Sequence, residues 1–136
     1  MPDLKEKAIS LLGSATLNGQ TTASKQAIYT VPAGKVVVVD HVVFRDPTAT
    51  LVGLIDLDLG GNALCDDWLQ QITIAGLTAT TDYGRAAQPV QAAGPPIVPV
   101  KVTEYAAAAI FGAYINTGST GAASFNIDLF GYLKDA

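Results

Sequence analysis

The sequence predicts an all-β protein, an antiparallel β-sandwich of jelly-roll-like type with a short N-terminal helix or arm. Short runs rich in β-branched and aromatic residues recur from residue 26 to the C-terminus, and clusters of Gly, Pro, Thr and Ser separate them. Helical patterns do not alternate with these runs, which disfavours a parallel sheet. An immunoglobulin-type sandwich is the structural alternative, although paired cysteines flanking a core tryptophan are absent.

The composition indicates a single domain whose surface is partly covered by other protein. The chain has 136 residues, of which 49% are hydrophobic and 15% charged, against about 25% charged in an average globular protein. We therefore expect a homo-oligomer. The net charge is −4 and the eight Lys and Arg residues are scattered, so neither a nucleic acid nor a membrane surface is an expected partner.

Cysteine content and the N-terminal residues indicate where the chain is made. Cys65 is the single cysteine, which excludes an intramolecular disulfide and a cysteine-based metal cage. The first residues lack the basic start and long apolar run of a secretory signal, and no run approaches the roughly 20 apolar residues that span a bilayer. We expect synthesis in a cytoplasm and no membrane segment.

Residues 1–25 are expected to form an N-terminal helix or arm and a linker, ahead of a β-sandwich domain over residues 26–136. The spacing predicts a short amphipathic helix over 3–12, because Asp3 can cap it and Gly13 can end it. Its apolar face would contain Leu4, Ala8, Leu11 and Leu12. Residues 14–25 have the composition of a loop. The helix packs either on a neighbouring subunit or on its own domain.

The β-type runs give the expected strands. The first two are separated by Pro-Ala-Gly, where Pro32 pre-sets φ and Gly34 can supply the positive φ of a type II turn, so this is a hairpin or a strand corner. The last two should form a C-terminal hairpin, and 75–95 should be a long, weakly structured excursion. The expected strands cover 26–31, 35–44, 52–59, 68–74, 96–103, 106–116 and 123–133.

Asp40 and His41 form the first candidate for chemistry. Neighbouring residues of a regular strand point to opposite faces of the sheet, so the two side chains are not expected to act as a dyad. A metal-binding jelly roll gathers several histidines, and this chain has one. The pattern favours a structural role for His41, near a sheet end or a subunit contact.

Acidic side chains form a second candidate site. Asp56 and Asp58 leave one face of a strand about 6–7 Å apart, a spacing compatible with a hydrolase pair or half a calcium site, which Asp66 and Asp67 could complete. No EF-hand loop, nucleophile elbow or phosphate-binding loop accompanies them. A solvated strand face is the favoured interpretation, with no cofactor and no catalytic residue.

Aromatic side chains leave two further interpretations open. Trp68, Tyr83, Tyr105 and Tyr114 could stack on sugars, with Trp68, Asp66 and Asp67 as the corresponding glycan site. Most of these aromatics lie inside apolar runs, which favours core packing or interface anchoring.

Two stretches resemble small virion proteins of tailed bacteriophages: "AIYTVPAGKVVVVDHVVF" (27–44), with its Tyr-Thr-Val-Pro-Ala-Gly-Lys corner, and "GAASFNIDLFGYL" (121–133), which closes on Gly-Tyr-Leu. The resemblance implies a virion structural protein, such as a capsid decoration (cement) protein, head fibre, tail fibre or baseplate component, often trimeric and jelly-roll-like. Its partners would be the major capsid protein or other virion proteins.

We therefore expect a non-enzymatic capsid decoration protein, located in the virion and made in the host cytoplasm, that stabilises a phage head through contacts between subunits. A tail-fibre or baseplate component, or a host-glycan-binding module, is the alternative, and a hydrolase using Asp56 and Asp58 comes third. The expected interface residues are Leu4, Ala8, Leu11, Leu12, Trp68, Ile110, Phe111 and Tyr114.

Overall fold

The computed structural model describes residues 8–20, 22–53, 56–75, 77, 85–87 and 104–136. Within these ranges the regular elements are nine β-strands, without a helix, which confirms the all-β fold class. The strands are β1 (Ser10–Asn18), β2 (Lys25–Thr30), β3 (Lys35–Arg45), β4 (Asp56–Gly60), β5 (Leu69–Ile72), β6 (Arg85–Ala87), β7 (Glu104–Tyr105), β8 (Ile110–Thr117) and β9 (Ser124–Asp135).

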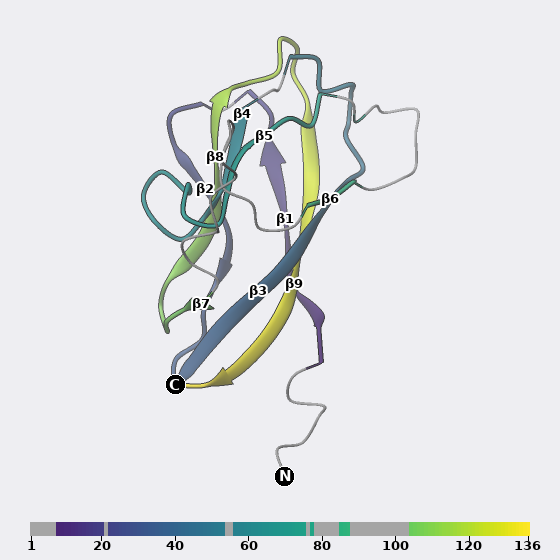
Figure 1. Cartoon of the computed structure of the whole chain (residues 1–136). Helices are drawn as coiled ribbons and strands as arrows, with labels where there is room; N and C mark the ends of the chain where they lie inside the picture. Colours follow the sequence, from purple (N-terminus) through teal and green to yellow (C-terminus); the bar gives the residue numbers. More distant parts are fainter. Residues whose placement is uncertain (1–7, 21, 54–55, 76, 78–84, 88–103) are drawn as a thin grey trace, which may run out of the picture.

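The strands form two antiparallel sheets that pack as a sandwich (Figure 1). Sheet A has the order β1-β9-β3-β6, with β7 also paired to β3, and sheet B has the order β2-β8-β4-β5. The pairing is nested: β1 with β9, β2 with β8, β3 with β6 and β7, and β4 with β5, alternating between the sheets. This nested order is a jelly roll, as the sequence predicts.

From β1 to β4 each strand lies in the other sheet from the one before it, whereas β4 and β5 pair with each other in sheet B. The turn after β2 has Gly34 at φ +74° and a hydrogen bond from the Lys35 amide to the Pro32 carbonyl, as expected for Gly34. It connects sheet B to sheet A and is therefore a corner. The predicted C-terminal hairpin is wrong for the same reason, because β8 lies in sheet B and β9 in sheet A.

The N-terminal region differs from its prediction. Residues 10–12 belong to strand β1, so the helix predicted over 3–12 is wrong for this part, and residues 1–7 lie outside the described residues. The loop predicted over 14–25 is likewise wrong for 14–18. β1 pairs with β9 from Ser10 to Asn18, and this long ladder outweighs the helical spacing of the leucines. In the structure these residues are part of sheet A.

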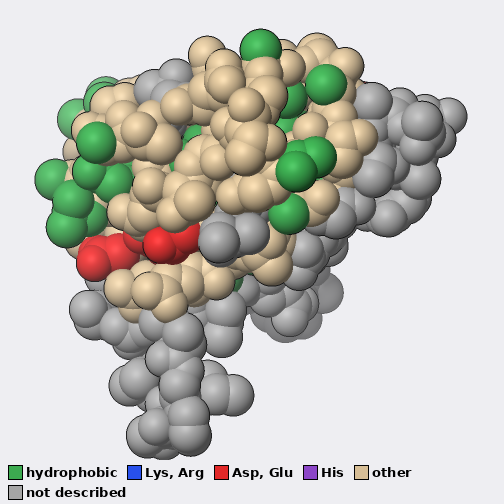
Figure 2. Space-filling model, turned by 90° about the horizontal axis from the view of Figure 1, so that it is seen from above, with side chains coloured by type: hydrophobic (Ala, Val, Ile, Leu, Met, Phe, Trp, Pro, Cys, Tyr) green, Lys and Arg blue, Asp and Glu red, His purple; other side chains and the backbone are tan. Residues whose placement is uncertain are grey.

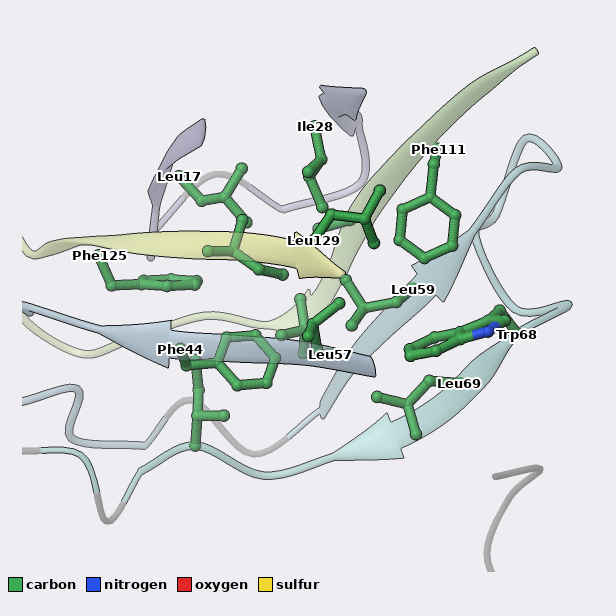
Figure 3. Packing of buried hydrophobic residues seen from close by; sticks show 14 of the residues in the cluster. Leu17, Ile28, Phe44, Leu57, Leu59, Trp68, Leu69, Phe111, Phe125 and Leu129 are labelled. Atoms are coloured by element: carbon green, nitrogen blue, oxygen red, sulfur yellow. The ribbon is translucent and has the colours of Figure 1, made fainter. Parts of the chain in front are cut away.

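A hydrophobic core fills the space between the sheets (Figure 3). Phe44 and Phe125 of sheet A lie opposite Leu57 and Leu59 of sheet B. At the other end, the Phe111 ring meets the rings of Trp68 and Tyr105 edge-on. The largest fully buried side chains are Trp68, Phe44, Phe111, Phe125, Leu17, Leu51, Leu57, Leu59, Leu69, Ile74 and Leu77.

The remaining expected strands agree with the structure only in part. β4 begins at Asp56, later than the expected 52, and β5 covers 69–72 of the expected 68–74. The strand expected over 96–103 lies outside the described residues, as does most of the excursion expected over 75–95. No helix in the described part of the chain is long and apolar enough to cross a membrane.

Candidate interaction surfaces

A row of three side chains crosses the outer face of sheet A. Leu11 of β1 and His41 of β3 both pair with Phe130 of β9, from its two sides. The neighbours of Phe130 along β9, Leu129 and Gly131, are buried, so Phe130 points away from the core. The Leu11 side chain is 56% exposed, and Phe130 and His41 are half-buried. We call Leu11, Phe130 and His41 the cross-strand row.

A β-bulge at Asp40 brings Asp40 and His41 together. Val39 pairs with Gly131 and His41 with Phe130, which leaves Asp40 as the extra residue. The buried positions of β3 change phase there, from Val37 and Val39 before it to Val42 and Phe44 after it. As a result, His41 Nδ1 lies 2.7 Å from Asp40 Oδ2. The expectation that these side chains leave opposite faces is wrong, because the strand is not regular here.

A second bulge faces the first across β9. Leu11 pairs with Phe130 and Gly13 with Leu129, so Leu12 is the extra residue of β1. Gly131 is the point of closest approach: a Cβ added there would lie 2.1 Å from the Val38 carbonyl oxygen. Glycine therefore lets β3 come close enough to β9 to form the bulge.

Polar groups cover the outer face of sheet A beyond the cross-strand row. Arg45 donates from Nε to Asp128 Oδ2 (2.6 Å) and from Nη2 to Asp128 Oδ1 (3.0 Å), a bidentate pair. Ser14 Oγ donates to the same Oδ1 at 2.6 Å, and Arg45 also contacts Asp46. The Arg45 hydrogen bond, followed by that of Ser14, lowers the pKa of Asp128 below its ordinary value. This network ties β1, β9 and β3 together.

The loops at one end of the sandwich are joined by backbone hydrogen bonds. The Gly19 amide donates to Ala123 (2.8 Å), Ser119 to Gly19 (2.8 Å), and Thr120 to Val52 (2.9 Å). Figure 2 looks down on this end, where some of the described hydrophobic side chains gather on one side beside the acidic ones and the others are scattered. An open groove of about 380 Å³ lies beside the loops, lined by Thr16, Leu17, Asn18, Gln20, Thr48, Ala122, Ala123 and Ser124. Its lining side chains are uncharged.

The four aspartates considered for calcium or catalysis are engaged in structural contacts, and the solvated strand face favoured from the sequence is wrong for Asp58. Asp58 is buried and accepts hydrogen bonds from the Gln71 amide (2.7 Å) and Asn116 Nδ2 (2.9 Å); burial raises its pKa. Asp56 is half-buried, and its Oδ1 lies 3.4 Å from the same Asn116 nitrogen. Asp66 forms a local loop with Asn62, whose Nδ2 donates to it at 2.6 Å.

Asp67 closes the loop after β4. Its Oδ1 accepts hydrogen bonds from the Gly61 amide (2.8 Å) and from the Tyr105 hydroxyl (3.1 Å). Within the described residues, no three His, Cys, Asp or Glu side chains are placed to hold a metal ion together. The structure thus gives the calcium hypothesis no common site for Asp56, Asp58, Asp66 and Asp67.

The residues expected at an interface divide into three groups. Trp68 and Phe111 are 1% and 0% exposed, so their place in an interface is corrected: the core of their own chain encloses both. Ala8, Leu11 and Ile110 are exposed, and Leu12 and Tyr114 are half-buried. Leu4 lies outside the described residues. Of the exposed ones, Leu11 lies in the cross-strand row.

The sequence did not lead us to place Phe130, Arg45 and Asp128 on one surface. The alternation along β9 could have shown part of it, because Phe125, Ile127 and Leu129 point inward and Asp128 and Phe130 therefore point outward. In sheet A, β9 lies between β1 and β3. Both strands are far from β9 in the sequence, so the sequence alone does not predict that the three are neighbours.

No protein-family model matches the chain, and no curated protein is significantly similar to it. Among solved structures, the chain is similar to one from the "Cyanophage Pam1 capsid asymmetric unit", with 18% sequence identity and a TM-score of 0.49. The match covers 92% of this chain and 83% of that chain.

Proposed function

We propose that this chain is a non-enzymatic structural protein of a tailed-phage virion and that it acts as a capsid decoration protein. The observation that carries the proposal is the cross-strand row, in which Leu11 and Phe130 present apolar surface on the outer face of sheet A beside the His41 imidazole. The sequence resemblance at 27–44 and 121–133 supports the same assignment. The partners would be the major capsid protein or other virion proteins.

The mechanism is burial of apolar surface by a stiff β-scaffold. Phe130 is held in place by the stacked imidazole of His41, whose plane is 3° from its own, and so presents a fixed surface. Leu11 is 56% exposed, so burying the rest of it would stabilise a contact by about half of the 1.5–3 kcal/mol of a fully exposed leucine. A symmetric shell repeats each contact many times, so modest contacts together stabilise the head.

The polar groups of the surface are engaged in structural contacts. The imidazole of His41 hydrogen-bonds Asp40 and stacks on Phe130, and within the described residues it has no hydrogen bond to a Ser, Thr or Cys side chain. Ser14 donates to Asp128, which Arg45 already pairs. These contacts favour a structural role for the Asp40–His41 pair and for the network around Asp128.

The glycan-binding alternative loses its expected site. Sugar stacking requires an accessible aromatic face, and the Trp68 indole is enclosed by the core. A tail-fibre or baseplate component would use the same kind of apolar contact, and immunogold labelling of virions distinguishes it from a decoration protein by the position of the label.

The test is binding of the purified protein to phage shells that lack it. Phe130→Glu places a charge in the cross-strand row, and Val52→Glu is the matched control because Val52 is exposed on a loop at the end of the sandwich. We expect Phe130→Glu to lower shell occupancy at least tenfold and Val52→Glu to leave it near wild type. Equal occupancy for the two variants would refute this surface as the capsid contact.

A deletion that tests the N-terminal arm has to end before β1 begins at Ser10. Removing residues 1–13 would also remove the start of β1, so it would disturb sheet A itself. Removing residues 1–7 leaves β1 whole. Weaker shell binding by that variant would support the arm as a clamp, and unchanged occupancy would argue against it.

A further inference from the structure

β1 is an open edge of sheet A. It pairs with β9 on one side, and the strand order of the sheet places no described strand on the other. β2 of sheet B lies close to β1, and the described hydrogen bonds along the free side are at Asn18, where Gln26 Oε1 accepts from the Asn18 amide (2.8 Å) and Gln26 Nε2 donates to its carbonyl (3.0 Å). The side chain of Gln26 thus pairs with Asn18 as a strand would, and no described group does so for residues 10–17.

The backbone N–H and C=O of Asn18 point away from β9, and their direction identifies which other backbone groups of β1 do the same. Along a strand, backbone N–H and C=O groups alternate between the two neighbours. Since those of Asn18 point away from β9, those of Thr16 and Ser14 do so as well, whereas Ala15 and Leu17 face β9. The edge therefore presents unpaired donors and acceptors at Thr16 and Ser14, and both residues are exposed.

Apart from the bulge at Leu12, β1 lacks the features that usually protect an edge strand, and residues 13–18 after the bulge pair with β9 in regular register. Its sequence SLLGSATLN contains no charged residue and no proline, and it has nine residues. The other described edges are shorter: β6 has three residues, β5 has four with Gln71 at positive φ, and β2 has six and begins with Lys25. Among the described strands, β1 is thus the edge best suited to accept another strand.

We propose that β1 pairs antiparallel with β1 of a second copy of this chain across a two-fold axis, joining two A sheets into one. A two-fold axis sets this uncharged edge against itself, so the strands bring no like charges together despite the net charge of −4. Leu11, the most exposed large hydrophobic residue described, then lies at the interface. The dimer does not depend on the proposed virion role.

The experiment is the mass of the purified full chain by analytical ultracentrifugation over a hundredfold range of concentration. We expect the wild type to have twice the chain mass of 14.0 kDa. Thr16→Pro removes an N–H that faces the free edge and keeps the β9 ladder, a position where edge strands accept proline. Thr16→Val is the matched control, since both variants lose the Thr16 hydroxyl bond to Asn126 and only the proline loses the N–H.

The proposal predicts a dimer for Thr16→Val and a dissociation constant raised at least tenfold for Thr16→Pro, with an unchanged circular dichroism spectrum. If Thr16→Pro does not fold, Leu11→Lys decides, because it leaves the backbone intact and should also weaken the dimer. A wild-type monomer at every concentration, a trimer as the virion resemblance implies, or a dimer insensitive to the folded variants would each overturn the proposal.

Discussion

The imidazole of His41 lies parallel to the ring of Phe130, with ring centroids 4.6 Å apart and planes 3° apart. The two residues come from adjacent strands and are in register, and the same imidazole holds the carboxylate of Asp40. The bulge is what allows both contacts, since a regular strand would send Asp40 and His41 to opposite faces. A sheet irregularity therefore determines the shape of the proposed contact surface.

Gly131 should be required for this bulge. Gly131→Ala sets a Cβ against the Val38 carbonyl, so we expect a loss of about 1–3 kcal/mol in the free energy of unfolding, or more if the backbone cannot shift. Gly121→Ala is the control, because nothing lies within 4 Å of its added Cβ. Urea denaturation measures both. Similar stability for the two variants would show that the approach of β3 to β9 is not tight.

The pair of Asp128 with Arg45 should make the protein less stable at acid pH. Arg45 lowers the pKa of Asp128 below the ordinary value of 3.8, so the stabilisation is complete above that pH and is lost as the pH falls through the lower, folded-state value. Asp128→Asn should cost about 1.5–3 kcal/mol at neutral pH, the usual contribution of a hydrogen bond to a charged group. It should also show a smaller drop in Tm than wild type as the solution is acidified.

Asp135→Asn serves as the control for that experiment. Lys35 also lowers the pKa of Asp135, but this side chain is 88% exposed, and solvent screens the pair. Thermal melts across the acid range should therefore be nearly the same for Asp135→Asn and wild type. Parallel wild-type and Asp128→Asn profiles would contradict the role given to the Arg45 pair.

Asp58 should affect the pH dependence of stability in the direction opposite to Asp128. Burial raises the pKa of Asp58, so its charged form is disfavoured in the folded state, and its contribution to stability improves as the pH falls from above the folded-state value towards 3.8. Asp58→Asn keeps an oxygen to accept from the Gln71 amide. We expect Tm at neutral pH to be equal to or above wild type. A clear drop in Tm would show that the charge itself is needed.

Trp68 should contribute to the stability of the fold and not to ligand binding. Trp68→Ala should cost about 3–5 kcal/mol, as for other large core residues. Nε1 of Trp68 is buried without a hydrogen-bond partner among the described residues, so Trp68→Phe loses no such bond and should cost clearly less. Guanidinium denaturation gives both values. Near-wild-type stability of Trp68→Ala together with a loss of glycan binding would restore the glycan-site hypothesis.

Local chemistry was sufficient for several features of this fold. Gly34 supplies the positive φ of the corner after β2, and the alternation of Leu57 and Leu59 places both in the core. These features depend on residues close together in the chain, which is why the sequence predicts them. The all-β class follows in the same way, from repeated runs and turns.

The candidate interaction surface, in contrast, depends on contacts between parts of the chain that are far apart in the sequence. The leucines at 11 and 12 have a spacing that fits a helix, yet they lie in β1 because pairing with β9 satisfies more backbone groups than a short isolated helix would. Likewise, the alternation argument failed at Asp40, since a bulge depends on the partner strand and on Gly131 within it.

By itself, the sequence determined the all-β class, several strands such as β2, β3, β8 and β9, the turn at Gly34 and the low content of charged residues, because each is a property of neighbouring residues or of composition. Only the tertiary structure decided which sheet each strand joins, that Leu11, Phe130 and His41 share one row, and that Trp68 is enclosed. The physical reason is that sheet pairing is non-local: side-chain direction follows from register, and one extra residue in a strand reverses it.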